Sequence, residues 1–303
     1  MGFRVVMIEN EVTINLKLNN MVIKKMDEEI WIPLDDISVI ILDNLNVMIS
    51  GRMLSILATN NIMVVICNNE HLPIGMYSSY DSHSRVSKCI GYQIEKEQEY
   101  YDLLWQDIVR CKIDNQRKVL ARLNIKEDVQ GNMSSLSEQI VSGDKTNREA
   151  HAAKIYFNAL MNTSFSRGNE NILLNSGLDY GYTIIRSFIA RACVGYGLNT
   201  QLGIHHKNEY NRFNLVDDLM EVVRPMVDYY SYELLENEEY FTANHRRKLV
   251  NMLNHRYVYN SKKMYVCNML ENYVEQYAAL LQGKREKICF PDFEGYIGEE
   301  DEV

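Results

Sequence analysis

The chain has 303 residues, of which 46% are hydrophobic and 24% charged, and its formal net charge is −9 at pH 7. This composition excludes a disordered or fibrous chain and allows one large or two ordinary globular domains. Six cysteines without a CxxC pair argue against a zinc site or a disulfide framework. With no run of ~20 apolar residues and no secretory leader, we expect a cytoplasmic protein without a membrane partner.

The negative charge is unevenly distributed. Residues 1–80 carry 5 basic and 9 acidic side chains, residues 81–290 carry 27 and 26, and residues 291–303 carry 0 and 6. We expect the acidic end, residues 291–303, to be a disordered tail. Phosphate binding relies on Lys and Arg, so a nucleic-acid partner would need local basic clusters. The alternative is that each such cluster is only a solvated helix face. The clusters available are Arg85 with Lys88, Arg246-Arg247-Lys248 and Lys262-Lys263.

Residues 1–76 are predicted to form a small β-rich domain. Segment 12–18 alternates apolar and polar residues, which is typical of a strand with one face on a core. Ser50 is predicted to cap a short helix over about 51–59. The expected product is a small sheet or sandwich. Its strands are predicted near 3–9, 12–18, 21–26, 30–34, 37–42 and 62–67.

After Pro73 the chain is predicted to be mostly helical, forming a second domain over residues 77–290. Pro225 is the only proline between Pro73 and Pro291, and apolar residues recur three and four apart. The Gly- and Ser-containing segment 124–146 is expected to be a mobile connector. The predicted fold class is therefore α+β, with a small N-terminal β domain and a larger all-helical catalytic domain. Helices are predicted near 86–94, 101–111, 147–163, 177–197, 215–233, 243–257 and 262–282.

The first candidate site lies at the start of the helix near 147–163. Glu149, Ala153 and Tyr156 share a face of that helix, so a carboxylate and a phenol project together beside a small side chain. The alternative is a capping box. In that arrangement Glu149, three residues after Thr146, satisfies a backbone N–H at the helix start.

A histidine pair and an acidic helix supply two further candidates. The rings of adjacent His205 and His206 point in different directions, so one at most serves a given site, and a surface or structural role is the alternative. Asp218 and Glu221 are three apart on one helical face, at the edge of an apolar surface where like charges need a cation. Arg224 could provide that charge in a plain salt bridge.

Taken together, these segments contain the donors that suit a hard divalent cation. Carboxylate oxygens fit Mg²⁺ or Mn²⁺, and an imidazole favours Mn²⁺ without requiring it. Such an ion lowers the pKa of an attacking hydroxyl and shields the charge at phosphorus in phosphodiester chemistry. Sequence spacing leaves open whether the segments meet in space.

Four strings of this sequence resemble the CRISPR-associated spacer integrase, the nuclease subunit of the adaptation complex, particularly its type II form. They stand in the family's order, and the similarity covers nearly the whole chain. The family's small β domain followed by a larger helical domain matches the architecture predicted above. The strings are Arg148-Glu-Ala-His-Ala-Ala-Lys-Ile-Tyr-Phe157, Gly177-Leu-Asp-Tyr-Gly-Tyr-Thr183, Leu202-Gly-Ile-His-His206 and Phe213-Asn-Leu-Val-Asp-Asp-Leu-Met-Glu-Val-Val-Arg-Pro-Met-Val-Asp228.

The resemblance implies a set of metal ligands. Glu149, His206 and Glu221 match the residues with which the family holds Mg²⁺ or Mn²⁺. Asp218 matches a second acidic residue of the same helix, which we interpret as supporting the site.

Other positions are implied less directly. Tyr156, Asn175 and Tyr182 lie in matching segments near the family's active site, and we include them as candidate catalytic residues. Two departures from the family pattern are visible. Ala150 stands where a glycine commonly follows the glutamate, and Val222-Val223 replaces a common Pro-Phe.

The resemblance also implies a reaction and partners. The 3′-hydroxyl of a short captured DNA duplex attacks a phosphodiester at the edge of a repeat, which inserts a spacer into a CRISPR array. The family works on double-stranded DNA as homodimers, two of which flank a small ferredoxin-like partner in a heterohexamer. In type II systems the RNA-guided effector nuclease and a ring-shaped DNA-end-binding accessory protein take part. The alternatives are a stand-alone structure-selective nuclease and a non-catalytic DNA-binding scaffold subunit.

Overall fold

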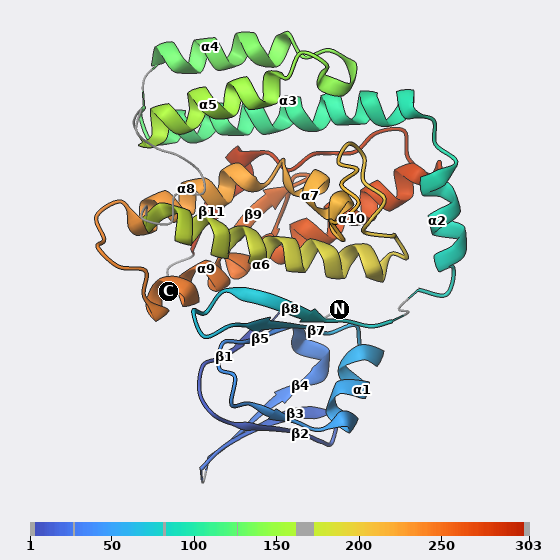
Figure 1. Cartoon of the computed structure of the whole chain (residues 1–303), viewed down its shortest axis with the longest axis vertical. Coiled ribbons are helices and arrows are strands. Elements are labelled where there is room, and N and C mark those ends of the chain that lie inside the picture. Colours follow the sequence, from blue (N-terminus) through green and yellow to red (C-terminus); the bar gives the residue numbers. More distant parts are fainter. Residues whose placement is uncertain (1–3, 27, 81–82, 126, 162–172, 300–303) are drawn as a thin grey trace.

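The computed structural model describes residues 4–26, 28–80, 83–125, 127–161 and 173–299, and its class is α+β as predicted (Figure 1). The strands are β1 Arg4–Ile8, β2 Thr13–Lys17, β3 Asn20–Lys25, β4 Glu28–Pro33, β5 Ile37–Leu42, β6 Met48–Ile49, β7 Met63–Cys67, β8 Pro73–Tyr77, β9 Arg256–Tyr259, β10 Lys262–Tyr265 and β11 Tyr296–Gly298. The α-helices are α1 Gly51–Thr59, α2 Val86–Ile94, α3 Gln98–Arg122, α4 Glu127–Glu138, α5 Arg148–Met161, α6 Leu173–Gly195, α7 Asn214–Met220, α8 Arg224–Leu235, α9 Ala243–Asn251 and α10 Val266–Leu281.

The N-terminal strands form two sheets packed as a sandwich, which is one of the two predicted arrangements. One sheet has the order β1-β5-β7-β8 and the other β4-β3-β2-β6. In the first sheet β1, β5 and β7 are parallel, and β8 closes the edge as an antiparallel strand. Ser50 caps α1 as predicted, because its hydroxyl accepts a hydrogen bond of 3.2 Å from the backbone N–H of Met53.

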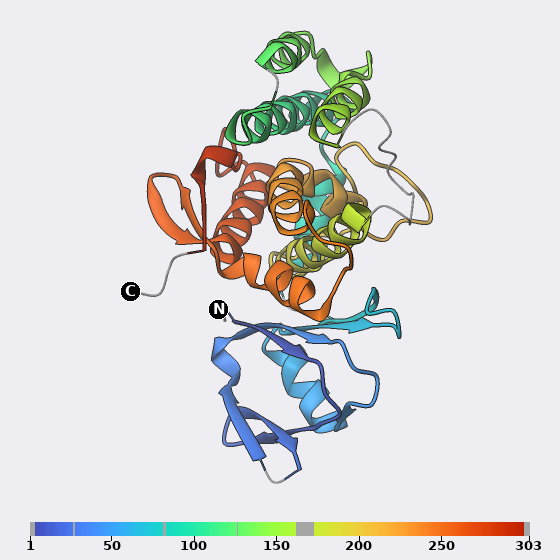
Figure 2. The same cartoon turned by 90° about the vertical axis from the view of Figure 1, so that its left-hand side faces the viewer.

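Strand β5 is buried along its whole length because both of its faces are covered. Ile40 and Leu42 belong to the core inside the sandwich, whereas Val39 and Ile41 belong to the core of the helical part. Successive side chains of a strand point to opposite faces, so one sheet serves two cores. Figure 2 shows the blue N-terminal part directly below the helices, with this sheet at the junction.

The helical part has two layers. Helices α3, α4 and α5 contact one another in an outer layer at the top of Figure 1, and α6 packs against α8, α9 and α10 below them. Gly181 on α6 permits close packing, since a Cβ there would lie 2.7 Å from Cγ1 of Val227 on α8. In the described part of the chain, no helix is long and apolar enough to cross a membrane.

Three predictions of local structure are wrong. The helix predicted over 215–233 is broken into α7 and α8, because Pro225 occupies the first turn of a new helix, where its missing N–H costs nothing. The helices predicted over 243–257 and 262–282 are present as α9 and α10, but α9 ends at Asn251 and α10 begins at Val266. Between them lies a β9–β10 hairpin, whose two-residue turn has positive φ at Asn260 and Ser261. The expected connector 124–146 contains α4.

The expectation of a disordered tail is wrong for residues 291–299. Phe293 and Tyr296 are only 3% and 2% exposed, and β11 pairs antiparallel with β9. On α3, the Asn115 side chain donates to the carbonyl oxygen of Pro291 and accepts from the N–H of Phe293, both at 2.9 Å. Ordering this segment costs conformational entropy, which acidic side chains in water would not offset. The buried aromatic rings and these hydrogen bonds offset it. Residues 300–303 lie outside the described chain.

A buried histidine under this C-terminal segment predicts a pH effect on stability. His255 Nδ1 lies 2.6 Å from the hydroxyl oxygen of Tyr296, and burial lowers the pKa of His255 below its usual 6.5. The unfolded chain therefore binds the proton more readily, so this contribution is present above about pH 6.5 and is lost as pH falls. Urea unfolding at pH 7.5 and 5.5 should show a smaller loss of unfolding free energy in His255→Asn than in the wild type. Equal losses in the two proteins would contradict this assignment.

Candidate functional site

Glu149 is free to face the interior because another residue caps its helix. The carboxylate of Asp144 accepts hydrogen bonds of 2.9 Å from the backbone N–H groups of both Arg148 and Glu149 at the start of α5. The capping box with Thr146 is therefore corrected: Asp144 is the cap. The Glu149 carboxylate instead accepts a hydrogen bond of 2.6 Å from Nζ of Lys112.

Glu221 lies at the break between α7 and α8 and is only 4% exposed. Its Oε1 is 2.9 Å from Nε of Arg224, which confirms the predicted salt bridge, and its Oε2 is 2.5 Å from Nζ of Lys112. The break is held from α3, where the Asn115 amide donates a hydrogen bond of 2.8 Å to the carbonyl oxygen of Val222. The irregular backbone thus has a defined position.

Lys112 joins two distant segments, and sequence reasoning missed it. Its ammonium group contacts both Glu149 and Glu221, and the side chain is only 10% exposed. Burial alone would lower the pKa of Lys112, but the two carboxylates raise it above its usual value. Burial alone would likewise raise the pKa of Glu221, but Lys112 and Arg224 lower it. Lys112 and Glu221 are therefore both charged at neutral pH.

His206 is held by the carboxylate of Asp218. Asp218 is fully buried, and its Oδ2 accepts the backbone N–H groups of Ile204 at 2.6 Å and of His205 at 2.8 Å. The Nδ1–H group of His206 donates to Oδ1 at 2.5 Å, and this hydrogen bond is the main reason why the pKa of His206 is raised. An imidazole fixed through Nδ1 keeps Nε2 for another partner, which is the usual support of a metal-binding histidine. Asp218 thus has the geometry of a supporting residue.

The two histidines diverge as predicted. Their ring planes are 85° apart. His205 stacks on Trp105 of α3 with ring centroids 4.4 Å apart, whereas His206 meets the same indole edge to face at 5.7 Å. His205 is thus held by packing, and His206 by Asp218.

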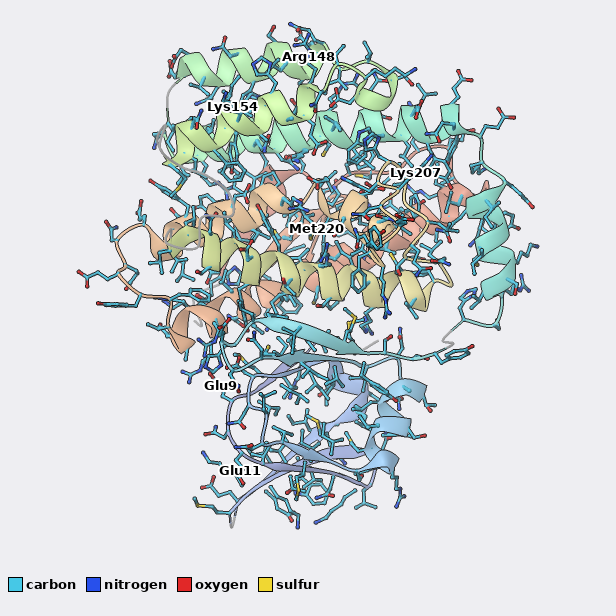
Figure 3. The ribbon with its side chains drawn as sticks, viewed as in Figure 1. Glu9, Glu11, Arg148, Lys154, Lys207 and Met220 are labelled. Atoms are coloured by element: carbon cyan, nitrogen blue, oxygen red, sulfur yellow. The ribbon has the colours of Figure 1, made fainter. Side chains whose placement is uncertain are left out.

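The predicted ligands approach one another without forming a closed metal site. The pKa of His206 is also raised by the charges of Glu221 and Glu149, so the three groups are electrostatically coupled. Figure 3 places Lys207 and Met220, the chain neighbours of His206 and Glu221, in the layer below α3 and α5. Within the described ranges, however, no three His, Cys, Asp or Glu side chains stand as a ready metal site. The metal assignment stays a prediction.

The donor set nevertheless fits a divalent cation. Two carboxylates already converge on one positive group, the Lys112 ammonium. Oε2 of Glu221, whose side chain is buried, lies 2.5 Å from that ammonium nitrogen. A buried carboxylate oxygen of this kind, beside an imidazole, suits Mg²⁺ or Mn²⁺.

A tyrosine cluster lies behind Glu221. The Arg224 guanidinium group, which pairs with Glu221, stands 4.7 Å from the ring centre of Tyr182. The Tyr182 hydroxyl donates to the buried carboxylate of Asp228, and Tyr156 is close enough for Asp228 to affect it. Burial raises the pKa of Tyr156 well above its usual value, so this phenol stays protonated. Tyr182 thus contacts the site through Arg224, and Tyr156 lies beside Tyr182 and Asp228. Asp228 is a further residue that sequence reasoning did not single out.

Asn175 is placed less closely. It is buried in the first turn of α6, and it shares a face with Tyr182, which follows two helical turns later. Its proposed role near the site stays a prediction.

One predicted DNA-binding cluster has another role. Arg246 is buried on α9 and pairs with Asp43 at 3.2 Å, and Arg247 pairs with Glu9 at 2.8 Å. Both acidic residues belong to the N-terminal part. Arg246 is therefore not available to phosphates, whereas a phosphate contact of the exposed Arg247 stays a prediction.

Comparison with known proteins agrees with this architecture. The family model described as "CRISPR associated protein Cas1" matches residues 5–259. The chain is 36% identical over 234 residues to the CRISPR-associated endonuclease Cas1 of Neisseria meningitidis serogroup C (strain 8013), covering 75% of this chain and 74% of the relative.

Two solved structures have a similar fold. A casposase bound to integration product matches with a TM-score of 0.79 at 18% identity, covering 99% of this chain and 95% of the casposase. A chain of a Cas6-RT-Cas1–Cas2 complex matches with a TM-score of 0.73, also at 18% identity, covering 94% of this chain and 35% of that one.

Proposed function

Because the chain belongs to the CRISPR associated protein Cas1 family, we propose that it is a metal-dependent DNA integrase and endonuclease that inserts spacers into a CRISPR array. One observation carries the proposal. Glu149 and Glu221, from different helices, converge on one cationic position beside His206, which Asp218 orients. Such a site suits phosphodiester chemistry, because it binds positive charge where a phosphate would acquire negative charge.

The proposed reaction is a transesterification. The 3′-hydroxyl oxygen of the incoming duplex forms a bond to a phosphorus of the repeat, the old P–O bond breaks, and the leaving oxygen takes a proton. One phosphodiester replaces another, so no ATP is consumed. A Mg²⁺ or Mn²⁺ ion held by Glu149, His206 and Glu221 would lower the pKa of the attacking hydroxyl. Asp218 keeps the proton of His206 on Nδ1, and Arg224 fixes the Glu221 carboxylate.

The proposed assembly contains double-stranded DNA, a homodimer of this chain and a small ferredoxin-like partner in a heterohexamer. Two similar structures support its outline, since they are named as a casposase with its integration product and as a complex containing Cas1 and Cas2. Participation of the RNA-guided effector nuclease and of a ring-shaped end-binding protein rests on the sequence resemblance.

A joining assay tests this proposal. Purified protein, its small partner, a labelled duplex and a supercoiled repeat plasmid are mixed with Mn²⁺ or with EDTA. We expect covalent joining with metal and wild-type protein, and none with EDTA or with His206→Ala. The control is His151→Ala, because His151 is exposed on α5 and points away from Glu149, two residues earlier.

The other outcomes favour the alternatives. Metal-dependent cutting without joining would support a stand-alone nuclease. Joining that continues with EDTA, or with His206→Ala at the wild-type rate, would overturn the metal site and support a scaffold role for these residues.

A further inference from the structure

Lys112 occupies a position that the proposed function does not explain. Its ammonium group lies 2.6 Å from Glu149 Oε1 and 2.5 Å from Glu221 Oε2, so it stands between two of the three proposed metal ligands. The side chain comes from the middle of α3 and is 10% exposed. Any divalent ion that binds both carboxylates must approach this same place.

The charges of the cluster balance without a metal ion. Glu149 and Glu221 contribute two negative charges, and Lys112 and Arg224 contribute two positive charges. This balance stabilises two buried carboxylates that would otherwise repel each other. It also disfavours a divalent ion, because that ion would bring two further positive charges beside the ammonium.

The two carboxylates differ in their other partners. Both lie within hydrogen-bond distance of the Lys112 ammonium group, at 2.6 Å for Glu149 and 2.5 Å for Glu221. Glu221 also keeps Arg224 at 2.9 Å on its other oxygen. Displacement of the ammonium therefore leaves Glu221 paired and frees an oxygen for a metal ion.

We propose that Lys112 is a built-in counter-ion that competes with the divalent metal for Glu149 and Glu221, and that the phosphate of bound DNA receives the displaced ammonium group. This inference rests on the proposed function. The free protein then binds metal weakly, and DNA strengthens metal binding because a phosphate compensates the additional positive charge. Metal and DNA affinities are thereby coupled, and the coupling is reciprocal.

The test measures Mn²⁺ binding by the full-length protein, using calorimetry or the spectrum of free Mn²⁺. In the absence of DNA, Lys112→Met should bind Mn²⁺ at least about tenfold more tightly than the wild type, since the competing charge is removed. Lys118→Met is the matched control, because Lys118 lies on the same helix, pairs with Asp292 and carries the same charge. Its Mn²⁺ affinity should equal that of the wild type. Equal affinities of Lys112→Met and wild type, or equal gains in both variants, would overturn the proposal.

A second arm adds a duplex with 3′-dideoxy ends, which binds without reacting. The duplex should tighten Mn²⁺ binding by the wild type and have a smaller effect on Lys112→Met. An equal effect on both would contradict the role of the phosphate.

If Lys112→Met folds poorly, thermal unfolding of a second variant, Lys112→Gln, tests the same proposal. Lys112→Gln keeps a polar side chain, and its thermal unfolding should occur at lower temperature than that of the wild type in EDTA but rise more with Mn²⁺. A rise no larger than that of the wild type would count against the proposal.

Mn²⁺ binding by Glu149→Gln distinguishes failure of the proposed function from failure of the role proposed for Lys112. If the wild type binds no Mn²⁺ even with DNA, the proposed function fails, and this inference fails with it. If the wild type binds Mn²⁺, Glu149→Gln does not, and Lys112→Met is unchanged, the role of Lys112 alone is disproved.

Discussion

Glu149→Gln should lower the rate of duplex joining by at least about 100-fold, because loss of even an outer contact to a metal ligand commonly costs 10- to 100-fold. The amide keeps the shape of the side chain but loses the charge that faces Lys112. Asp144 caps α5, so the helix start does not depend on Glu149. The measurement is the joining rate at saturating Mn²⁺, together with thermal unfolding to confirm that the variant is folded.

The control for this substitution is Glu138→Gln on α4. Glu138 is exposed, and its substitution removes the same charge from the same outer layer of helices. Its joining rate should equal that of the wild type. A folded Glu149→Gln protein that joins at the wild-type rate would show that this carboxylate binds no essential ion.

Asp218→Asn should lower the free energy of unfolding by about 3 kcal/mol, because removing one partner of a buried charged group commonly costs that much. Asp218 is fully buried and accepts the N–H groups of Ile204 and His205 as well as the imidazole of His206. An amide replaces one acceptor oxygen by an NH₂ group, so at least one buried donor loses its partner. Joining should also fall, because the ring of His206 is released.

Urea unfolding measures the stability of this variant. Asp107→Asn is the comparison, because Asp107 is an exposed partner of Arg110 on α3, and such surface changes stay within about 0.5 kcal/mol. If Asp218→Asn is as stable as Asp107→Asn, the Asp218 carboxylate does not hold the His206 loop.

Regular elements were predictable from the sequence where local pattern and tertiary structure agree. The alternation of apolar and polar residues over 12–18 predicted β2, and Ser50 predicted the start of α1. The break before Pro225 was harder, since Val222 and Val223 are not typical helix breakers and the turn is held from outside, by Asn115 on α3. The order of the C-terminal segment was not predicted because its acidic composition is typical of disorder, although Phe293 is buried.

The site was predictable in part, and mainly by resemblance. Adjacent carboxylates indicated a cation, but spacing along the chain could not show that α3 brings Glu149 and Glu221 together. Lys112 was missed because lysines are usually exposed. A signal existed, since Lys112, Asn115 and Gln116 interrupt the buried apolar stripe of α3, where polar side chains need a partner inside the protein.

Strand β5, with one core on each of its faces, limits how the protein can be re-engineered. A chimera that exchanges the N-terminal part for that of a relative would change the packing against the helical core as well as the sandwich. Val39 and Ile41 would have to be exchanged together with compatible residues of the helical core. Exchange at the loop after β8 would therefore need redesign of the facing helices, whereas in the β4-β3-β2-β6 sheet only the face turned away from the sandwich core can be varied alone.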